Sequence, residues 1–209
     1  MSVAVVQGET ILAEVSFSGR SHASRLLPAV DYVLRAGEAG PGSLSAIAVS
    51  NGPGSFTGLR IGLSFAKGLA ESLGVPLVLV STLLGLAAQC ELHAGYIVPV
   101  LDAQRDEYYA AVFRSNAYGV ERLTDDIIVQ KGGLVHRLEE LGARDCLVTG
   151  DAAEVAALWG GYRVAPAAAR VLRAGVLGLV AQSLPTTDPR LAVPNYIRSS
   201  SARPKQRGV

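Results

Sequence analysis

Cysteine is scarce in this sequence, with two residues in 209, and no Cys-x-x-Cys pair is present. Cys90 and Cys146 lie far apart, which predicts reduced thiols in the interior rather than a disulfide framework or a zinc site. The sequence has no secretory signal and no apolar run long enough to cross a bilayer. We therefore expect a cytoplasmic protein without membrane contact.

An excess of charge of one sign is also missing. The 19 Lys and Arg residues nearly balance the 18 Asp and Glu residues, and the formal net charge is +1. Nothing in this balance indicates a nucleic-acid-binding protein, which usually carries a basic patch. The hydrophobic content of 49% is enough for one globular unit or two small subdomains.

The familiar phosphate and nucleophile motifs are absent as well. The turn Asn-Gly-Pro-Gly at 51–54 is followed by no Gly-Lys-Ser/Thr, and its glycine spacing does not fit the dinucleotide fingerprint. The histidines are scattered, and none lies near a Gly-x-Ser-x-Gly elbow: His22, His93 and His136. A phosphate site at the turn therefore has weak support, and a peptidase has less.

The sequence does contain a crossover unit around this turn. The apolar run 46–49 predicts a buried strand, and Ser55 is placed to cap a helix that runs to about Ser72. Gly74 ends that helix, and the run 77–80 predicts the next buried strand. Strand, glycine turn, helix and strand in this order are typical of a parallel sheet.

The helix of this unit is apolar over about twice the arc that packing on one sheet requires. Its polar residues form one narrow stripe: Arg60, Ser64, Lys67 and Glu71. Small residues recur every four positions: Gly58, Gly62, Ala66 and Ala70. Two interpretations stay open, which are tight packing of this row on the protein's own sheet and docking of a second helix from elsewhere or from another chain.

Strands and helices alternate along the rest of the chain, which predicts an α/β protein with two subdomains. We expect an N-terminal subdomain at 1–95, a C-terminal subdomain at 96–198 and a disordered basic tail at 199–209. The other expected elements are strands at 1–6, 10–17, 96–103, 107–113 and 146–151 and helices at 21–37, 82–93, 152–158 and 171–184.

Two acidic pairs stand out. Asp102 and Glu107 flank a hairpin bend, where carboxylates are more often caps or solvated groups than a catalytic pair. Asp125 and Asp126 are interpreted as a surface pair with no matching partner, so no metal site is predicted there.

The eleven residues from Gly52 to Gly62, Gly-Pro-Gly-Ser-Phe-Thr-Gly-Leu-Arg-Ile-Gly, resemble the signature of the TsaB (YeaZ) family. Segments at 22–28, 102–109 and 194–198 also resemble family segments, with Gln104 in place of an arginine. The resemblance implies an actin-like ATPase (ribonuclease H-like) fold. The family usually begins with one more strand, which ends in Asp-Thr/Ser and forms part of the phosphate-binding floor. This sequence begins at what resembles the family's second strand, so we expect either that its start is set too late or that the first strand is missing.

TsaB proteins help bacteria to form threonylcarbamoyladenosine beside the tRNA anticodon. The resemblance therefore implies a non-catalytic subunit that binds and activates a TsaD-type catalytic subunit, with a TsaE-type ATPase in the larger complex and at most indirect contact with tRNA. A homodimer is the expected state when the partner is absent, and ATP or ADP is expected only at the joint interface. TsaD carries two metal-binding histidines where this chain has Thr82 and Leu86, so no metal is expected.

The expected partner interface consists of apolar and small residues on the helices at 21–37 and 55–72: Leu26, Leu27, Val30, Val33, Gly58, Ile61, Gly62, Phe65, Ala66 and Leu69. Two other functions stay open. An ATP-binding phosphotransferase or ATPase would share the fold, but it needs phosphate loops from both subdomains. A peptidase needs a nucleophile, a base and an orienting group.

Overall fold

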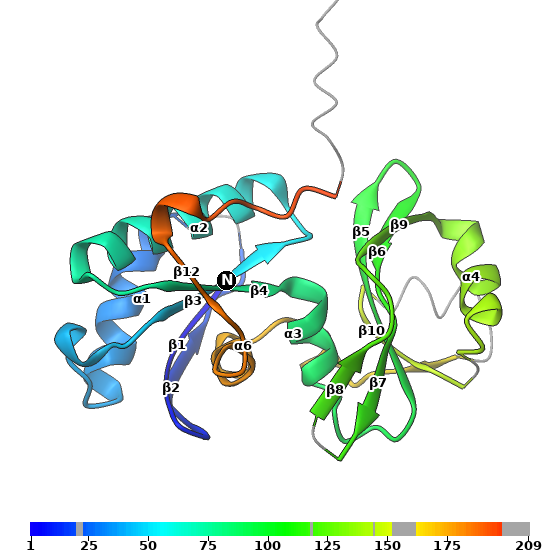
Figure 1. Cartoon of the computed structure of the whole chain (residues 1–209), viewed down its shortest axis with the longest axis horizontal. Coiled ribbons are helices and arrows are strands. Elements are labelled where there is room, and N and C mark those ends of the chain that lie inside the picture. The colour runs from blue at the N-terminus through cyan, green and yellow to red at the C-terminus, as the bar shows by residue number, and fades with distance from the viewer. Residues whose placement is uncertain (20–22, 118, 144, 152–161, 198–209) are drawn as a thin grey trace, which may run out of the picture.

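The computed structural model describes residues 1–197 except 20–22, 118, 144 and 152–161. These residues form two α/β lobes that lie side by side, with the short helix α3 (Thr82–Ala88) between them (Figure 1). We call the lobe that contains the first four strands the N-terminal lobe, and the other the C-terminal lobe. No helix among the described residues is both long and apolar enough to cross a membrane.

The N-terminal lobe is built on two small sheets. Strands β1 (Ser2–Gln7) and β2 (Thr10–Ser16) form the predicted antiparallel hairpin. Strands β3 (Ile47–Gly52) and β4 (Leu77–Ser81) are parallel, and α2 (Phe56–Leu73) crosses between them as predicted. Within the described part of the chain β1 and β3 are not paired with each other, so the two sheets are separate.

The last part of the chain returns to the N-terminal lobe. Helix α6 (Ala174–Ala181) contacts both sheets of this lobe, and strand β12 (Thr186–Thr187) pairs with β4. The sequence-based boundary placed these residues in a C-terminal subdomain at 96–198, so that boundary was wrong for them. The pattern of α6 predicts a buried helix but does not say which sheet covers it.

The C-terminal lobe is one mixed sheet with a helix on it. Its strands are β5 (Tyr96–Gln104), β6 (Glu107–Ala110), β7 (Phe113–Asn116), β8 (Gly119–Arg122), β9 (Ile127–Gln130), β10 (Leu147–Gly150) and β11 (Arg163–Val164). The strand order is β11-β10-β5-β6-β9, and β7 pairs with β5 and β8. The helix predicted at 152–158 lies outside the described residues.

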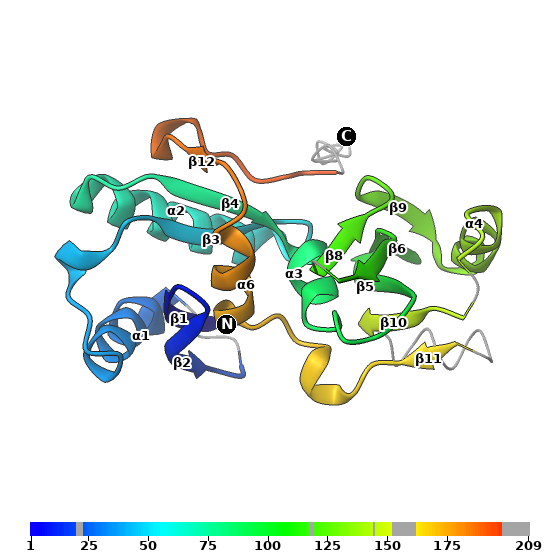
Figure 2. The same cartoon turned by 60° about the horizontal axis from the view of Figure 1, so that its bottom comes forward.

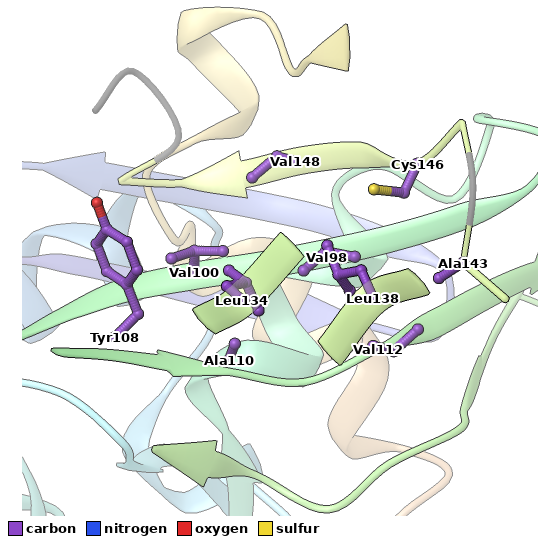
Figure 3. Close-up of a cluster of buried hydrophobic side chains, with 10 residues drawn as sticks. All are labelled: Val98, Val100, Tyr108, Ala110, Val112, Leu134, Leu138, Ala143, Cys146 and Val148. Atoms are coloured by element: carbon purple, nitrogen blue, oxygen red, sulfur yellow. The ribbon is translucent and has the colours of Figure 1, made fainter. Parts of the chain in front are cut away.

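The core of this lobe lies between the sheet and α4 (Leu134–Glu140), as Figure 3 shows. Leu134 and Leu138 of α4 face the sheet and are almost fully buried. Cys146 belongs to this cluster and Cys90 to a neighbouring one, and both are free and buried, as predicted. Burial of apolar side chains on both sides of this contact is what holds α4 on the sheet.

Helix α1 (Ala23–Ala36) covers the β1–β2 hairpin. Single 3-10 turns occur at Pro41–Ser43, Lys131–Gly133, Ala167–Ala169 and Pro189–Leu191. The last of these turns lies in a segment that runs over α2 and on toward the C-terminal lobe, drawn in orange and red in Figure 1. We call residues 188–197 the C-terminal connector.

Candidate partner interface

Helix α2 begins at a glycine turn that the C-terminal connector holds closely. Ser55 caps the helix, since its side chain accepts a hydrogen bond from the Gly58 amide at 3.3 Å. Gly52 has a φ of +118°, and a Cβ there would lie 2.9 Å from the carbonyl oxygen of Asn195. The Asn195 amide donates to the carbonyl of Asn51 at 2.7 Å. Because Gly52 has no side chain, the connector can pack closely against the glycine turn. The connector group that faces the turn here is a carbonyl oxygen and not an N–H donor.

One side of α2 packs on the protein's own core. Leu63, Ala66 and Ala70 are buried, and their cluster includes Leu77 of β4 and Ala192 of the connector. At about 100° per residue these three helix positions lie within an arc of about 60°. The second half of the small-residue row therefore serves the protein's own sheet.

A neighbouring side of α2 is not covered in the same way. It contains five apolar or small residues within an arc of about 100°: Gly58, Ile61, Gly62, Phe65 and Leu69. None of them is fully buried, and none belongs to a buried cluster within the described ranges. A Cβ at Gly62 would meet no atom within 4 Å. We call these five residues the open face of α2.

Helix α1 contacts α2 but directs most of its apolar side inward. Val33 is 1% exposed and packs in a cluster with Val5 of the hairpin. Leu26 and Val30 are half-buried, and Leu27 is 63% exposed. Leu27 is therefore the residue of α1 that offers the most apolar surface among those predicted for the interface.

The predicted interface set was too broad by two residues, because Val33 and Ala66 lie in the protein's own cores. Apolar periodicity identifies the sides of a helix that avoid water, but it does not identify the neighbour that covers each side. The other eight residues of the set keep at least part of their surface exposed.

Sequence reasoning missed the contact of the connector with the polar side of α2. Lys67 donates hydrogen bonds from Nζ to the carbonyls of Arg190 and Ala192, at 3.3 and 3.2 Å. The rings of Phe56 and Tyr196 stack with centroids 5.3 Å apart, and Arg60 lies over Phe56 at 5.3 Å. Both rings are about half exposed, so they add an aromatic surface beside the start of α2. The family-like segment at 194–198 was the signal that could have suggested it.

The residues that stand where TsaD carries histidines have structural roles here. The Thr82 hydroxyl forms a 2.6 Å hydrogen bond with the hydroxyl of Ser50, and Leu86 is 1% exposed in the interior.

The histidines that the structure describes do not form a metal site either. His136 pairs with Glu140 on α4 at 3.2 Å, and burial lowers the pKa of His93 in a loop after α3. His22 lies outside the described residues. Where the structure is described, no group of three or more His, Cys, Asp or Glu side chains is placed to hold a metal ion.

The two carboxylates of the β5–β6 hairpin have separate partners. Asp102 accepts hydrogen bonds from the amide and the side chain of Gln104, at 3.1 and 2.9 Å. Glu107 accepts one from Gln130 of the neighbouring strand at 2.9 Å. These bonds fix the bend and the strand pairing, which agrees with the capping interpretation rather than with a catalytic pair.

Asp126 is not the unpartnered surface residue that the sequence suggested. Its side chain is 8% exposed, and Oδ1 lies 2.6 Å from Nη1 of Arg122. The sequence interpretation was wrong because Arg122 lies on β8, and only the following turn brings the two side chains together.

Comparison with known proteins places these features in a family. The family model described as TsaD, tRNA N6-adenosine threonylcarbamoyltransferase, matches residues 10–157. The tRNA threonylcarbamoyladenosine biosynthesis protein TsaB of Bacillus subtilis is 35% identical over 141 residues, which cover 67% of this chain and 62% of that protein. The chain therefore spans about three fifths of this curated relative. An uncharacterized protein of Mycobacterium tuberculosis is 32% identical over 200 residues, which cover 96% of this chain and 84% of the relative.

A solved structure from Pseudomonas aeruginosa has the same fold. It is an uncharacterized protein described as similar to peptidase YeaZ, and it matches with a TM-score of 0.77 and 26% identity over 94% of both chains. The predicted α/β fold of the actin-like, ribonuclease H-like class is confirmed. The chain therefore belongs to the family of tRNA N6-adenosine threonylcarbamoyltransferase and, within it, to the TsaB (YeaZ) proteins.

Proposed function

We propose that this chain is the non-catalytic subunit of the complex that forms threonylcarbamoyladenosine on tRNA next to the anticodon. In that complex it binds and activates a TsaD-type catalytic subunit. Relatives from three bacteria that are named as TsaB biosynthesis proteins support the pathway. The residues at the metal positions of TsaD support a non-catalytic role, since Thr82 is hydrogen-bonded to Ser50 and Leu86 is buried.

The observation that carries the proposal is the open face of α2. Gly58 and Gly62 let another backbone come close, and the half-buried side chains of Ile61, Phe65 and Leu69 keep part of their apolar area exposed beside them. Contiguous exposed apolar surface on a soluble protein usually marks an interaction site. Docking of a partner helix in this row would bury the apolar area that the protein's own sheet leaves uncovered.

The remaining parts of the complex follow from the same proposal. We place ATP or ADP at the joint interface with the partner, because the carbonyl oxygen of Asn195 faces the glycine turn in the chain alone. A TsaE-type ATPase joins the larger complex, and contact of this chain with tRNA is at most indirect. The complex forms in the cytoplasm, where tRNA is modified.

The direct test is co-purification with the TsaD-type subunit of the same organism. Light scattering on the size-exclusion peak is expected to give the mass of a heterodimer. Formation of threonylcarbamoyladenosine on tRNA is expected only when both subunits are present together with the other pathway proteins. Two separate peaks for the two proteins, with and without ADP, would contradict the proposal.

A second measurement addresses catalysis by the chain alone. Phosphate release from ATP by the pure protein is expected to stay far below the usual enzyme range of about 1–1000 per second. Turnover within that range would instead support the ATPase alternative.

A further inference from the structure

A polar cluster at the junction of the two lobes is not explained by the proposed interface. It joins the end of β4, strand β8, the turn after β8 and the C-terminal connector: Ser81, Arg122, Asp126 and Asn195. Arg122 donates to Asp126 at 2.6 Å and to the Ser81 hydroxyl at 3.0 Å. The Asn195 side chain donates to Oδ2 of Asp126 at 3.1 Å.

Asp126 is the centre of this cluster. Both of its carboxylate oxygens are hydrogen-bonded, and the side chain is 8% exposed, whereas Arg122 is 30% exposed. A nearly buried carboxylate needs its charged partner and its donors, because leaving it unpaired is costly. The cluster therefore links the two lobes and the connector through one carboxylate.

The connector carries this link to the start of α2. The backbone amide of Asn195 donates to Asn51 at 2.7 Å, and its carbonyl oxygen lies against Gly52. The next residue, Tyr196, stacks on Phe56. The residue that reaches Asp126 is thus the one that closes the glycine turn.

A second set of contacts joins the lobes elsewhere. The side chain of Gln89 donates to the carbonyls of Ala169 and Val171, each at 3.1 Å, and accepts from the Arg173 amide at 2.7 Å. These bonds tie together the two chain segments that cross between the lobes, 89–95 and 170–173. Beside them, α3 buries Leu83 against the C-terminal lobe. Figure 2 shows the connector on one side of the junction and the crossover that precedes α6 on the other.

We propose that Ser81, Arg122, Asp126 and Asn195 form a latch, and that the lobes rotate about α3 and Gln89 when the latch opens. Opening releases the Asn195 side chain from Asp126, so the connector is then held over the glycine turn only by its contacts with the N-terminal lobe and uncovers the turn more often. The apolar packing of α3 stays in place because water does not replace it, whereas polar groups of the latch can exchange their partners for water. In hinge motions a few loop or element-terminal residues absorb the change in backbone angles, and the crossing segments 89–95 and 170–173 are of this kind.

The test compares amide hydrogen exchange at Asn195 in the wild-type chain and in two variants. Asp126→Asn removes the charge at the centre of the latch, and Asn195→Ala removes the donor but keeps the reporting amide. We expect each variant to exchange about tenfold faster at Asn195, which corresponds to about 1.4 kcal/mol. In the double variant the effect is expected to be smaller than the product of the single effects, because both side chains act through one contact.

Glu121→Gln is the matched control. This substitution removes the 3.1 Å ion pair between Glu121 of β8 and Arg114 of β7, which both lie in the C-terminal lobe. It is expected to leave amide exchange at Asn195 unchanged. Melting curves and X-ray scattering on the same samples show that each variant is folded and whether the lobes separate. Wild-type exchange at Asn195 in both variants would overturn the latch, and so would effects that multiply in the double variant. All measurements use this chain alone, so they do not depend on the proposed partner.

Discussion

Gly150 sets the distance between two strands of the C-terminal lobe. It ends β10 with a φ of +78°, and a Cβ there would lie 2.2 Å from the carbonyl oxygen of Val100 on β5. This approach is shorter than any real carbon–oxygen contact, so a side chain at this position forces the strands apart. Glycine is therefore required at position 150 both by the close approach of Val100 and by the positive φ.

We expect Gly150→Ala to lower the free energy of unfolding by about 3 kcal/mol or more, as backbone strain and overpacking add. Gly142→Ala is the control, because Gly142 has a similar φ of +67° but nothing within 4 Å of a Cβ. Its cost is expected to be that of the backbone angle alone, about 1 kcal/mol. Urea unfolding of both variants measures the difference, and equal costs would show that the contact with Val100 does not matter.

Cys146 provides a second prediction at this scale. Its thiol is fully buried, and burial raises the pKa from 9.0 to about 12. The unfolded thiol loses its proton first as the pH rises above 9.0, so the free energy of unfolding falls between that pH and about 12. The fall that this one group causes is at most about 1.4 kcal/mol per pH unit.

Cys146→Ala is expected to remove this contribution while costing about 1 kcal/mol or more near neutral pH through the lost packing. Unfolding curves of wild type and variant at several pH values from neutral to alkaline measure it, and the stability gap is expected to narrow as the pH rises. A gap that stays constant over this range would show that the Cys146 thiol does not make the stability pH-dependent.

At the scale of one element, one apolar side of α2 packs on the protein's own core, and the neighbouring side is the open face. Ala66 lies on the side that packs on the protein's own core, and Gly62 lies on the open face. The row of small residues along the helix therefore runs from the open face at Gly62 to the core side at Ala66. Packing on the protein's own sheet is observed for Ala66, whereas docking of a second helix at Gly62 stays a prediction.

Replacing Ala66 or Gly62 by leucine distinguishes a residue that packs in the core from one that binds a partner. Ala66→Leu is expected to lower the free energy of unfolding by about 1–3 kcal/mol through overpacking. Gly62→Leu is expected to keep or raise stability, because glycine is the poorer helix former by about 1 kcal/mol. It should still weaken binding of the TsaD-type partner by about 5- to 150-fold, since the new side chain separates the backbones.

Melting curves and titration calorimetry on the same two proteins measure both effects. If Gly62→Leu binds the partner as tightly as wild type does, the interface lies elsewhere, and the exposed Leu27 of α1 and the ring of Phe56 become the next residues to replace.

At the scale of the whole molecule, a second copy of the chain is expected to cover the open face of α2 when the partner is absent. We expect the isolated chain to self-associate in sedimentation-equilibrium runs at high micromolar concentration, because a second copy can bury the same apolar row. Gly62→Leu is expected to shift the sample toward the monomer. A wild-type chain that stays monomeric throughout would contradict an apolar docking surface of useful size.

The amino-acid sequence by itself determined the family and most local elements of the N-terminal lobe, whereas β7, β8, β9 and α4 of the C-terminal lobe were not predicted. Ser55 caps α2 and Gly74 ends it with a φ of +68°, as their residue types predict. The β1–β2 hairpin and the parallel β3–β4 pair were likewise predicted from patterns that span a few residues. Such features depend on backbone preferences and on neighbours close in sequence, so the sequence contains all that is needed to predict them.

Only the tertiary structure decided what covers each surface. Whether Ala66 or Gly62 is buried depends on β4 and on the connector, and α6 belongs to the N-terminal lobe because two sheets there enclose it. Asp126 acquires its partners from Ser81 and Asn195, which are 45 and 69 residues away along the chain. Contacts at such separations leave no periodic signal, because they arise when the packed elements bring distant side chains together, and their energy comes from that shared burial.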